Sequence, residues 1–348
     1  MGSRPTDPRR DIAVLGAGAW GTTLAIVLAR QGHRVRLWGA DEARLARLAH
    51  ERCNAAYLPG VAFPDSLTTE PGLAALSGCQ NILVAVPSGG FRAVVRAVAP
   101  ALRPDTVLAW ATKGLETGTG RRMSEIVEEI RPGHPGALIT GPSFAREVAA
   151  GLPTALTVVS TQTAVADEVA QWLRHARLRV YTGRDMLGAE LCGAIKNVLA
   201  IAVGISDGLG FGANARAALI TRGLAELIRF TSALGGQRET VMGLAGIGDL
   251  VLTCTDDLSR NRRVGLALGR GRQLGDIVGE LGQAVEGVAS AREVCLLAQA
   301  QGVEMPIVEQ VHAVLFEGQT PAKAVDALLN RQPRPEDPLA GDPGNKRL

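Results

Sequence analysis

An apolar segment near the start of the chain, Asp11–Leu15, runs directly into the turn Gly16-Ala17-Gly18-Ala19-Trp20-Gly21 and then into an apolar helical pattern. This is G-x-G-x-x-G between a strand and a helix, the arrangement that binds the pyrophosphate of a dinucleotide. Gly16 permits the tight turn, Gly18 lets the backbone approach the pyrophosphate, and Gly21 lets the helix lie close to the strand. The helix amino terminus would then face the phosphates with free N–H groups. The alternative is an ordinary glycine turn.

The pattern of the chain changes once, near residue 190. Before it, β-branched segments alternate with amphipathic helical patterns, which predicts a parallel sheet covered on both faces. The expected strands are 11–15, 34–38, 81–86, 106–111, 137–139, 154–160 and 178–181, with helices near 20–31, 41–52, 89–99, 119–130 and 163–174. After it, only helices are expected, at about 188–204, 214–234, 238–254, 261–269, 287–301, 306–316 and 321–330.

The predicted fold class is therefore α/β: a Rossmann-type doubly wound parallel sheet followed by an all-helical C-terminal domain. A length of 348 residues suits two domains. We expect a dinucleotide-binding domain at 11–190 and a helical substrate and dimerisation domain at 191–331. The ends, 1–10 and 332–348, are rich in Pro, Gly and charge and are expected to be mobile tails.

Composition limits the class of protein further. The formal net charge is only +3 and the basic residues are spread along the chain, so no nucleic-acid partner is expected. The five cysteines are odd in number and include no C-x-x-C pair, which argues against disulfides or a metal site and favours a reducing compartment. The polar amino terminus lacks an apolar stretch, so no signal peptide is expected, and no membrane span is expected because no apolar run is judged to approach the ~20 residues that a span needs. We expect a cytoplasmic protein.

The choice between NAD and NADP stays open in the sequence. An NAD site usually places Asp or Glu at the end of the second strand, but this strand ends in Gly39-Ala40-Asp41. Asp41 could substitute from two residues further on. A 2′-phosphate would need a cation, for which Arg36 and Arg44 are the nearest candidates, although both could equally be ordinary surface arginines. Val86 and Pro87 could pack on the cofactor or simply end a strand.

Two polar segments follow expected strands and should therefore reach the cleft at the carboxyl ends of the sheet. Lys113 comes after the strand T-V-L-A-W-A, where it could touch a substrate or be a solvated lysine. Gly141-Pro142-Ser143 comes after A-L-I-T and offers a hydroxyl and backbone N–H groups at a helix start. Such groups suit an anion, although Ser143 could also be a simple helix cap.

Lys196 interrupts a helix that is otherwise almost entirely apolar. Such a lysine either extends to solvent or is desolvated, and desolvation lowers the pKa of an amine toward neutrality, where it can exchange protons. Asn197 and Glu190 could orient it.

Asp249 also sits in an apolar run and should have a partner, which Lys196 could be. Thr253 shares its helix face one turn on. Ser259-Arg260-Asn261 then suits a phosphate, or is a polar loop at a helix start.

Taken together these segments resemble one family, the bacterial-type NAD(P)-dependent glycerol-3-phosphate dehydrogenases. The resemblance rests on ordered segments over about residues 11–330: G-A-G-A-W-G-T, Y-L-P-G, V-P-S, K-G-L-E, G-P-S-F-A-R-E-V, C-G-A-I-K-N-V, N-A-R-A-A-L-I-T-R-G-L, G-I-G-D-L-V-L-T-C, S-R-N and V-E-G. Two departures occur. Ala19 stands where many members have Ser, and Ala40-Asp41 stands where many have His or Arg, which weakens an NADP assignment carried over from the family.

The resemblance implies reversible hydride transfer between NAD(P)H and dihydroxyacetone phosphate, giving sn-glycerol 3-phosphate for glycerophospholipid synthesis. Lys196 would be the general acid, supported by Lys113, Asp249 and Thr253. The implied substrate contacts are Lys113, Gly141, Ser143, Lys196, Asn197, Asp249, Ser259, Arg260 and Asn261. The implied cofactor contacts are Gly16, Gly18, Ala19, Trp20, Gly21, Lys113, Ala145, Arg260, Ala284 and Glu286. A homodimer formed through the helical domain is usual for the family.

Two other hypotheses compete with this one. A dehydrogenase of the same architecture could act on a 3-hydroxy acid or a phosphorylated sugar acid, since such enzymes often use a Lys-Asn pair, but G-I-G-D-L and S-R-N argue against it. A dinucleotide-sensing protein without catalysis is the second. Retention of Lys113, Lys196, Asp249 and Arg260 argues against that hypothesis.

Overall fold

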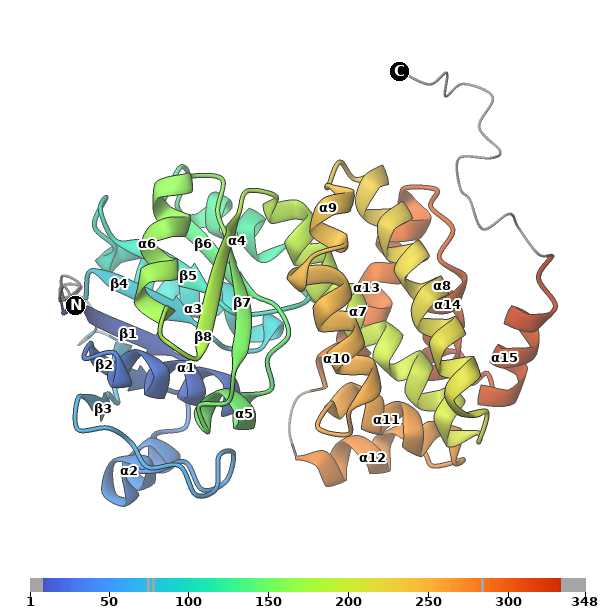
Figure 1. The fold of residues 1–348 in the computed structure, drawn as a ribbon, viewed down its shortest axis with the longest axis horizontal. Coiled ribbons are helices and arrows are strands. Elements are labelled where there is room, and N and C mark those ends of the chain that lie inside the picture. The colour runs from blue at the N-terminus through green and yellow to red at the C-terminus, as the bar shows by residue number, and fades with distance from the viewer. Residues whose placement is uncertain (1–8, 74–75, 77–78, 283–284, 333–348) are drawn as a thin grey trace.

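The computed structural model describes residues 9–73, 76, 79–282 and 285–332 (Figure 1). The predicted tails, 1–10 and 332–348, therefore lie almost wholly outside the described residues, as does Ala284.

Eight strands form one sheet in the order β3-β2-β1-β4-β5-β6-β7-β8. They are β1 (Asp11–Leu15), β2 (Arg34–Trp38), β3 (Leu67–Thr69), β4 (Asn81–Val84), β5 (Val107–Trp110), β6 (Gly136–Thr140), β7 (Thr154–Val159) and β8 (Leu178–Gly183). The helices of this part are α1 (Ala19–Arg30), α2 (Glu42–Glu51), α3 (Ser88–Val98), α4 (Met123–Ile130), α5 (Ala145–Ala149) and α6 (Thr163–Leu173), besides a 3-10 turn, Ala99–Ala101. The predicted doubly wound fold is confirmed. The short strand β3 was missed, and α5 was expected only as a helix start after Gly141-Pro142-Ser143.

The sheet is parallel from β3 to β6, but β7 runs antiparallel to β6. Strand β8 is parallel to β7 and therefore also runs opposite to the first six strands. Only the short helix α5 separates β6 from β7. Thr23 of α1 donates a hydrogen bond to the carbonyl of Ala145 in α5 (3.0 Å), so the chain stays near α1 instead of crossing the sheet. A parallel neighbour needs such a crossover. The strict expectation of a parallel sheet therefore fails for the last two strands.

The second part of the chain is all-helical within the described residues, as predicted. Its helices are α7 (Met186–Gly208), α8 (Gly212–Ala233), α9 (Arg238–Val241), α10 (Asp249–Thr255), α11 (Arg260–Gly269), α12 (Leu274–Leu281), α13 (Glu286–Ala300), α14 (Pro306–Phe316) and α15 (Pro321–Leu329). The expectation that no apolar run reaches the length of a membrane span is wrong for α7, which alone among the described helices is long and apolar enough to cross a membrane. However, 94% of its apolar window is buried inside the protein, surrounded by the other helices (Figure 1).

The predicted helix at 238–254 is broken in the structure. A π-helical turn, Leu244–Gly248, separates α9 from α10, and the N–H of Gly248 bonds the carbonyl of Gly243 (3.2 Å). A side chain at Gly246 would overlap the backbone of Val241, so this glycine allows the tight turn. The break matters because it makes Asp249 the first residue of α10.

Helices α7 and α11 touch backbone to backbone through paired glycines. A Cβ at Gly204 would overlap the carbonyl oxygen of Arg262 and lie 2.9 Å from the Cα of Gly265. One turn further on, a Cβ at Gly269 would lie 2.9 Å from the Cα of Gly208. This contact fixes α11 against the helix that carries Lys196.

We expect Gly204→Ala to destabilise the fold by about 1–3 kcal/mol, because the added methyl group forces two backbones apart. The free energy of unfolding in urea would measure this. Gly279→Ala in α12 is the matched control, since a Cβ there meets nothing within 4 Å and alanine favours a helix. Equal stability of both variants would contradict the role given to the close contact.

Candidate active site

The glycine-rich turn has the geometry that its three glycines predicted. Gly16 has φ 128°, and a Cβ there would lie 2.5 Å from the carbonyl oxygen of Ala85. A Cβ at Gly21 would overlap the carbonyl oxygen of Gly16, whereas at Gly18 it would meet nothing within 4 Å. Gly18 is the N-cap of α1, and no side chain caps that terminus. The turn lies beside β1, where the strand order reverses, so it opens on the crevice used for dinucleotides.

Asn54 fastens this turn and was not among the residues predicted from the sequence. Its buried amide donates hydrogen bonds to the carbonyl of Ala17 (3.2 Å) and to the hydroxyl of Thr22 (2.8 Å). The only signal was its place just before the segment Y-L-P-G.

The carboxyl end of β2 shows why the usual acidic residue is absent. A Cβ at Gly39 would lie 2.9 Å from the Cβ of Ala17, so a side chain here would press on the glycine-rich turn. Asp41 caps α2 by accepting the N–H of Arg44 (2.9 Å). Arg36 lines a surface hollow with Arg9 and with Asp11, where β1 begins, so it lies away from the crevice.

Arg44 is the cation that remains beside the crevice. Its guanidinium donates to the hydroxyl of Tyr57 (2.9 Å) and lies 5.1 Å from the centre of that ring. Its Nε atom and the indole Nε1 of Trp20 are buried, with no acceptor in the described part of the chain. Buried donors of this kind normally have a partner. The turn, Trp20 and Arg44 therefore fit a phosphate-bearing dinucleotide.

Two lysines from different domains meet on one carboxylate. Lys196 Nζ donates to Asp249 Oδ1 (2.7 Å) and to the hydroxyl of Thr253 (3.0 Å). Lys113 Nζ donates to Asp249 Oδ2 (2.7 Å) and, at 3.4 Å, to the carbonyl of Gly141. The predicted pair of Lys196 with Asp249 is therefore present, and Lys113 joins it.

The residues of this cluster are positioned either at the end of a strand or on a helix. Lys113 and Gly141 follow β5 and β6, at the edge where the crevice lies. Asp249 and Thr253 share one face of α10, and the Thr253 hydroxyl donates to the Asp249 carbonyl (2.6 Å). The hydroxyl of Ser143 donates to the carbonyl of Gly141 (3.1 Å), so the predicted G-P-S segment lies beside Lys113.

Burial and charge shift the proton affinities of this cluster. Lys196 is only 7% exposed, and desolvation lowers its pKa to about 8, although the negative charge of Asp249 acts to raise it. Burial acts to raise the pKa of Asp249, but the ammonium groups of Lys113 and Lys196 outweigh it and hold that pKa below its usual value. The result is an ionised carboxylate holding a lysine that can give and take a proton near neutral pH.

A second polar group continues from Lys196 along α7. Asn197 donates to the carboxylate of Glu286 (3.3 Å) and accepts from the amide of Asn261 (2.9 Å). Asn261 in turn accepts the N–H of Gly287 (2.9 Å). The predicted residues Asn197, Asn261 and Glu286 are thus brought together.

The S-R-N segment begins α11, with its first residue as a cap. Ser259 is the N-cap and accepts the N–H of Arg262 (3.2 Å), as the simpler interpretation of this loop expected. Arg260 is half-buried at the first helical position, next to Asn261.

Glu190 does not orient Lys196, contrary to one of the alternatives above. Its carboxylate accepts from the N–H (2.8 Å) and the hydroxyl (2.5 Å) of Ser124 at the start of α4. Burial raises its pKa to about 7. Glu190 and Lys196 are six positions apart, which makes about 1.7 helical turns, so the two side chains leave different faces of α7.

The fold and the site define a class: a two-domain dehydrogenase with a crevice for a nicotinamide dinucleotide and a cluster of two lysines on one buried carboxylate. Residues 11–166 match the family described as NAD-dependent glycerol-3-phosphate dehydrogenase N-terminus, and residues 185–326 match its C-terminus. The chain belongs to this family of oxidoreductases, which act on a CH–OH group with NAD or NADP.

Named relatives agree along nearly their whole length. "Glycerol-3-phosphate dehydrogenase [NAD(P)+]" of Thioalkalivibrio sulfidiphilus is 57% identical over 93% of this chain and 98% of its own. The protein of the same name from Shewanella amazonensis is 52% identical over 95% and 98%. The crystal structure of glycerol-3-phosphate dehydrogenase from Coxiella burnetii aligns with a TM-score of 0.90 at 48% identity, covering 93% and 99% of the two chains.

Proposed function

We propose that this chain catalyses reversible hydride transfer between NAD(P)H and dihydroxyacetone phosphate, forming sn-glycerol 3-phosphate, with Lys196 as the general acid. The observation that carries the proposal is the buried Lys196 ammonium, held by Asp249 and Thr253 in a member of this family. The names of the relatives supply the substrate.

The chemistry follows from the charges in the cluster. When bound, the nicotinamide supplies the hydride for the carbonyl carbon. Lys196 donates its proton to the carbonyl oxygen as negative charge develops there, and Lys113 places a second positive charge beside the same oxygen. Asp249 and Thr253 keep the Lys196 ammonium aimed at that oxygen. In the oxidative direction, neutral Lys196 accepts the proton.

The remaining predicted residues would hold the two ligands. Arg260, with Ser259 and Asn261, would bind the phosphate, because a guanidinium matches a phosphate with two parallel hydrogen bonds. Gly141, Ser143 and Asn197 would contact the rest of the substrate. The glycine-rich turn would receive the pyrophosphate, with Ala19 and Trp20. Lys113, Ala145, Arg260, Ala284 and Glu286 would line the cofactor, although Ala284 lies outside the described residues.

Oxidation of NADPH and NADH, followed by absorbance, tests this proposal with dihydroxyacetone phosphate as substrate and dihydroxyacetone as control. We expect rapid oxidation only with the phosphorylated ketone. Protein that is folded and binds dinucleotide, yet oxidises neither nucleotide with this substrate, would overturn the proposal. Turnover of a 3-hydroxy acid's keto form instead would favour the competing dehydrogenase hypothesis.

We expect Arg44→Ala to raise the KM for NADPH about tenfold or more while changing the KM for NADH little. Arg44 is the described cation beside the carboxyl end of β2, and its loss would remove the charge facing a 2′-phosphate. Initial rates with each nucleotide measure this. Arg47→Ala, an exposed arginine on the same helix, is the matched control. An equal change in both KM values would show that Arg44 does not distinguish the two cofactors.

We further propose a division into domains at 11–190 and 191–331, and a place in the cytoplasm with reduction as the physiological direction. The two family parts, which match residues 11–166 and 185–326, support a division into two domains, and α7, which begins at Met186, spans the proposed boundary. The free state of all five cysteines supports a reducing compartment.

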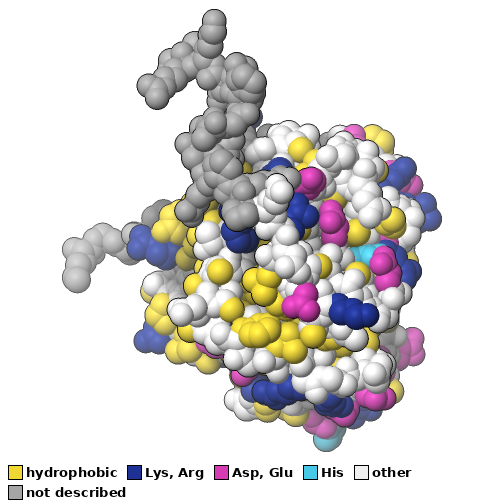
Figure 2. Space-filling view, turned by 90° about the vertical axis from the view of Figure 1, so that its right-hand side faces the viewer, with side chains coloured by type: hydrophobic (Ala, Val, Ile, Leu, Met, Phe, Trp, Pro, Cys, Tyr) yellow, Lys and Arg dark blue, Asp and Glu magenta, His cyan; other side chains and the backbone are white. Residues whose placement is uncertain are grey.

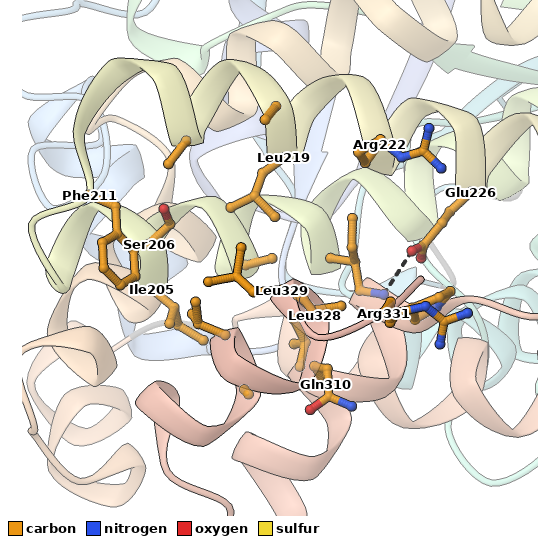
Figure 3. A pocket seen from close by; sticks show the side chains of 18 of the residues that line it. Ile205, Ser206, Phe211, Leu219, Arg222, Glu226, Gln310, Leu328, Leu329 and Arg331 are labelled. Carbon is orange, nitrogen blue, oxygen red and sulfur yellow. Dashed lines mark hydrogen bonds between the residues drawn. The ribbon is translucent and has the colours of Figure 1, made fainter. Parts of the chain in front are cut away.

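A homodimer through the helical domain completes the proposal. An apolar groove of about 700 Å³ lies between α7, α8, α14 and α15, at the end of the molecule far from the sheet (Figures 1 and 2). Figure 3 shows apolar side chains along it, among them Ile205, Phe211, Leu219, Leu328 and Leu329, and the charged residues Arg222, Glu226 and Arg331 at one end. A twofold contact uses the same patch twice, so the patch must be complementary to itself. A largely apolar groove can meet an identical groove in this way, which fits a second copy of the chain.

We expect the protein to sediment at twice its 36.3 kDa mass, and Ala218→Glu to convert it to monomers. Ala218 is an exposed residue of α8 that lines the groove, so the new carboxylate would lose its hydration only on association. Sedimentation equilibrium over a range of concentrations measures this. Ala164→Glu, at an exposed position on α6, is the matched control. An unchanged mass for Ala218→Glu would place the interface elsewhere.

A further inference from the structure

We propose that Arg262 is a positioning residue for the substrate phosphate. It would hold the turn between α10 and α11 so that Ser259 and Arg260 can bind the phosphate while the carbonyl group of the same substrate lies at Lys196. This inference rests on the proposed function, since it concerns how the phosphate is bound. Arg262 was not among the residues that the sequence singled out.

The guanidinium of Arg262 is almost fully buried, and all three of its nitrogens donate hydrogen bonds. Nε donates to the carbonyl of Cys254 (3.0 Å), Nη2 donates to Asp207 Oδ2 (2.6 Å), and Nη1 donates to the carboxylate of Asp257. The side chain is only 7% exposed. A buried charge with this many partners fixes the backbone that carries them.

These partners belong to the segments that carry the proposed chemistry. Cys254 follows Thr253 in α10, the helix of Asp249, and its carbonyl is among those that a helix end leaves unpaired. Asp207 lies near the end of α7, the helix of Lys196. Asp257 lies in the turn that leads to Ser259. Arg262 thus joins the proton-donor helices to the phosphate loop.

Further contacts fix the turn that leads into α11. The hydroxyl of Ser259 accepts the backbone N–H of Arg262 (3.2 Å), and Asp207 has a second cation in Arg216 (3.0 Å). The carbonyl of Arg262 lies against Gly204 in the close contact of α7 with α11. These contacts fix the position of the first turn of α11. A lysine at 262 could not maintain it, because an ammonium lacks the planar set of donors that a guanidinium offers.

The test compares Arg262→Lys and Arg262→Gln with Arg263→Lys, an exposed neighbour, as matched control. We expect the KM for dihydroxyacetone phosphate to rise about tenfold or more in both Arg262 variants, with kcat changed far less. The slow reduction of dihydroxyacetone, which has no phosphate, should stay as in the wild type at saturating NADPH. The affinity for NADPH should fall by a smaller factor than the affinity for dihydroxyacetone phosphate, because Arg260 also lines the cofactor. The inhibition constant of inorganic phosphate should rise in parallel with the KM.

A second variant guards against loss of the fold. Asp257 is 73% exposed, so Asp257→Asn should fold, and it should raise the same KM by a smaller factor because it weakens only one arm of the guanidinium. Equal losses with dihydroxyacetone and its phosphate would show that Arg262 is merely structural, and an unchanged KM in all variants would overturn the inference. A wild type with no preference for the phosphorylated ketone would instead defeat the proposed function itself.

Discussion

Replacing Lys196 by alanine is expected to lower the turnover of dihydroxyacetone phosphate by about a thousandfold or more, the range typical of removing a general acid. The ammonium is the group that both Asp249 and Thr253 orient, and burial sets its pKa at about 8, so it is protonated yet ready to donate at neutral pH. Lys113 donates to the other oxygen of the same carboxylate, so its ammonium group cannot occupy the position of the Lys196 ammonium and replace it as proton donor. Steady-state rates at saturating substrate and cofactor measure the loss.

The glycine-rich turn and Arg44 contain no atom of this cluster, so the dissociation constant of NADPH should stay within about threefold of the wild type. Lys323→Ala on α15 is the matched control, because that lysine is exposed and far along the chain from the cluster. Arg at 196 would keep a charge but hold its proton too tightly to donate it. Near-normal turnover in Lys196→Ala would remove Lys196 from the mechanism.

Local patterns in the sequence predict the parts of this site that depend on backbone conformation or on a single charged residue within an apolar segment. Gly16 and Gly21 were recognisable because a side chain at either would meet nearby backbone, and Gly18 was recognisable because it leaves the turn open to a ligand. Lys196 was recognisable because a charge in an apolar helix must have a reason. Thr253 followed from Asp249, since four residues make about one turn.

Contacts between segments distant in the chain were less predictable. Lys113 and Asp249 are 136 residues apart in the sequence, and the residues around each give no indication that the two side chains form an ion pair. Arg262 reads as one more arginine in R-N-R-R, and only its burial separates it from the exposed Arg263. The break before Asp249 and the reversal of β7 have the same origin. In both, backbone geometry that the hydrophobic pattern does not show overrides the pattern: Gly246 permits the π-helical turn, and the short connection through α5 reverses the strand.

Replacing Asp249 by asparagine should lower both stability and activity. The carboxylate is 2% exposed and accepts from two ammonium groups, so its neutral substitute leaves two charges without their counterion. Breaking a buried pair in this way costs about 3–5 kcal/mol of folding free energy. Urea unfolding measures the loss, with Asp326→Asn on the exposed face of α15 as matched control.

The same variant should move the pH dependence of reduction to lower pH. In the wild type, kcat/KM should fall as the pH rises through about 8, because Lys196 loses the proton that it must donate. Asp249 acts to raise that pKa, so its removal leaves desolvation and the charge of Lys113, which lower it, opposed only by the smaller effect of Glu286, which raises it. The fall should therefore begin at a more acid pH in Asp249→Asn. A fall at unchanged pH would mean that the titrating group is not Lys196 held by this carboxylate, whereas a shift toward alkaline pH would reverse the sign required by the electrostatics.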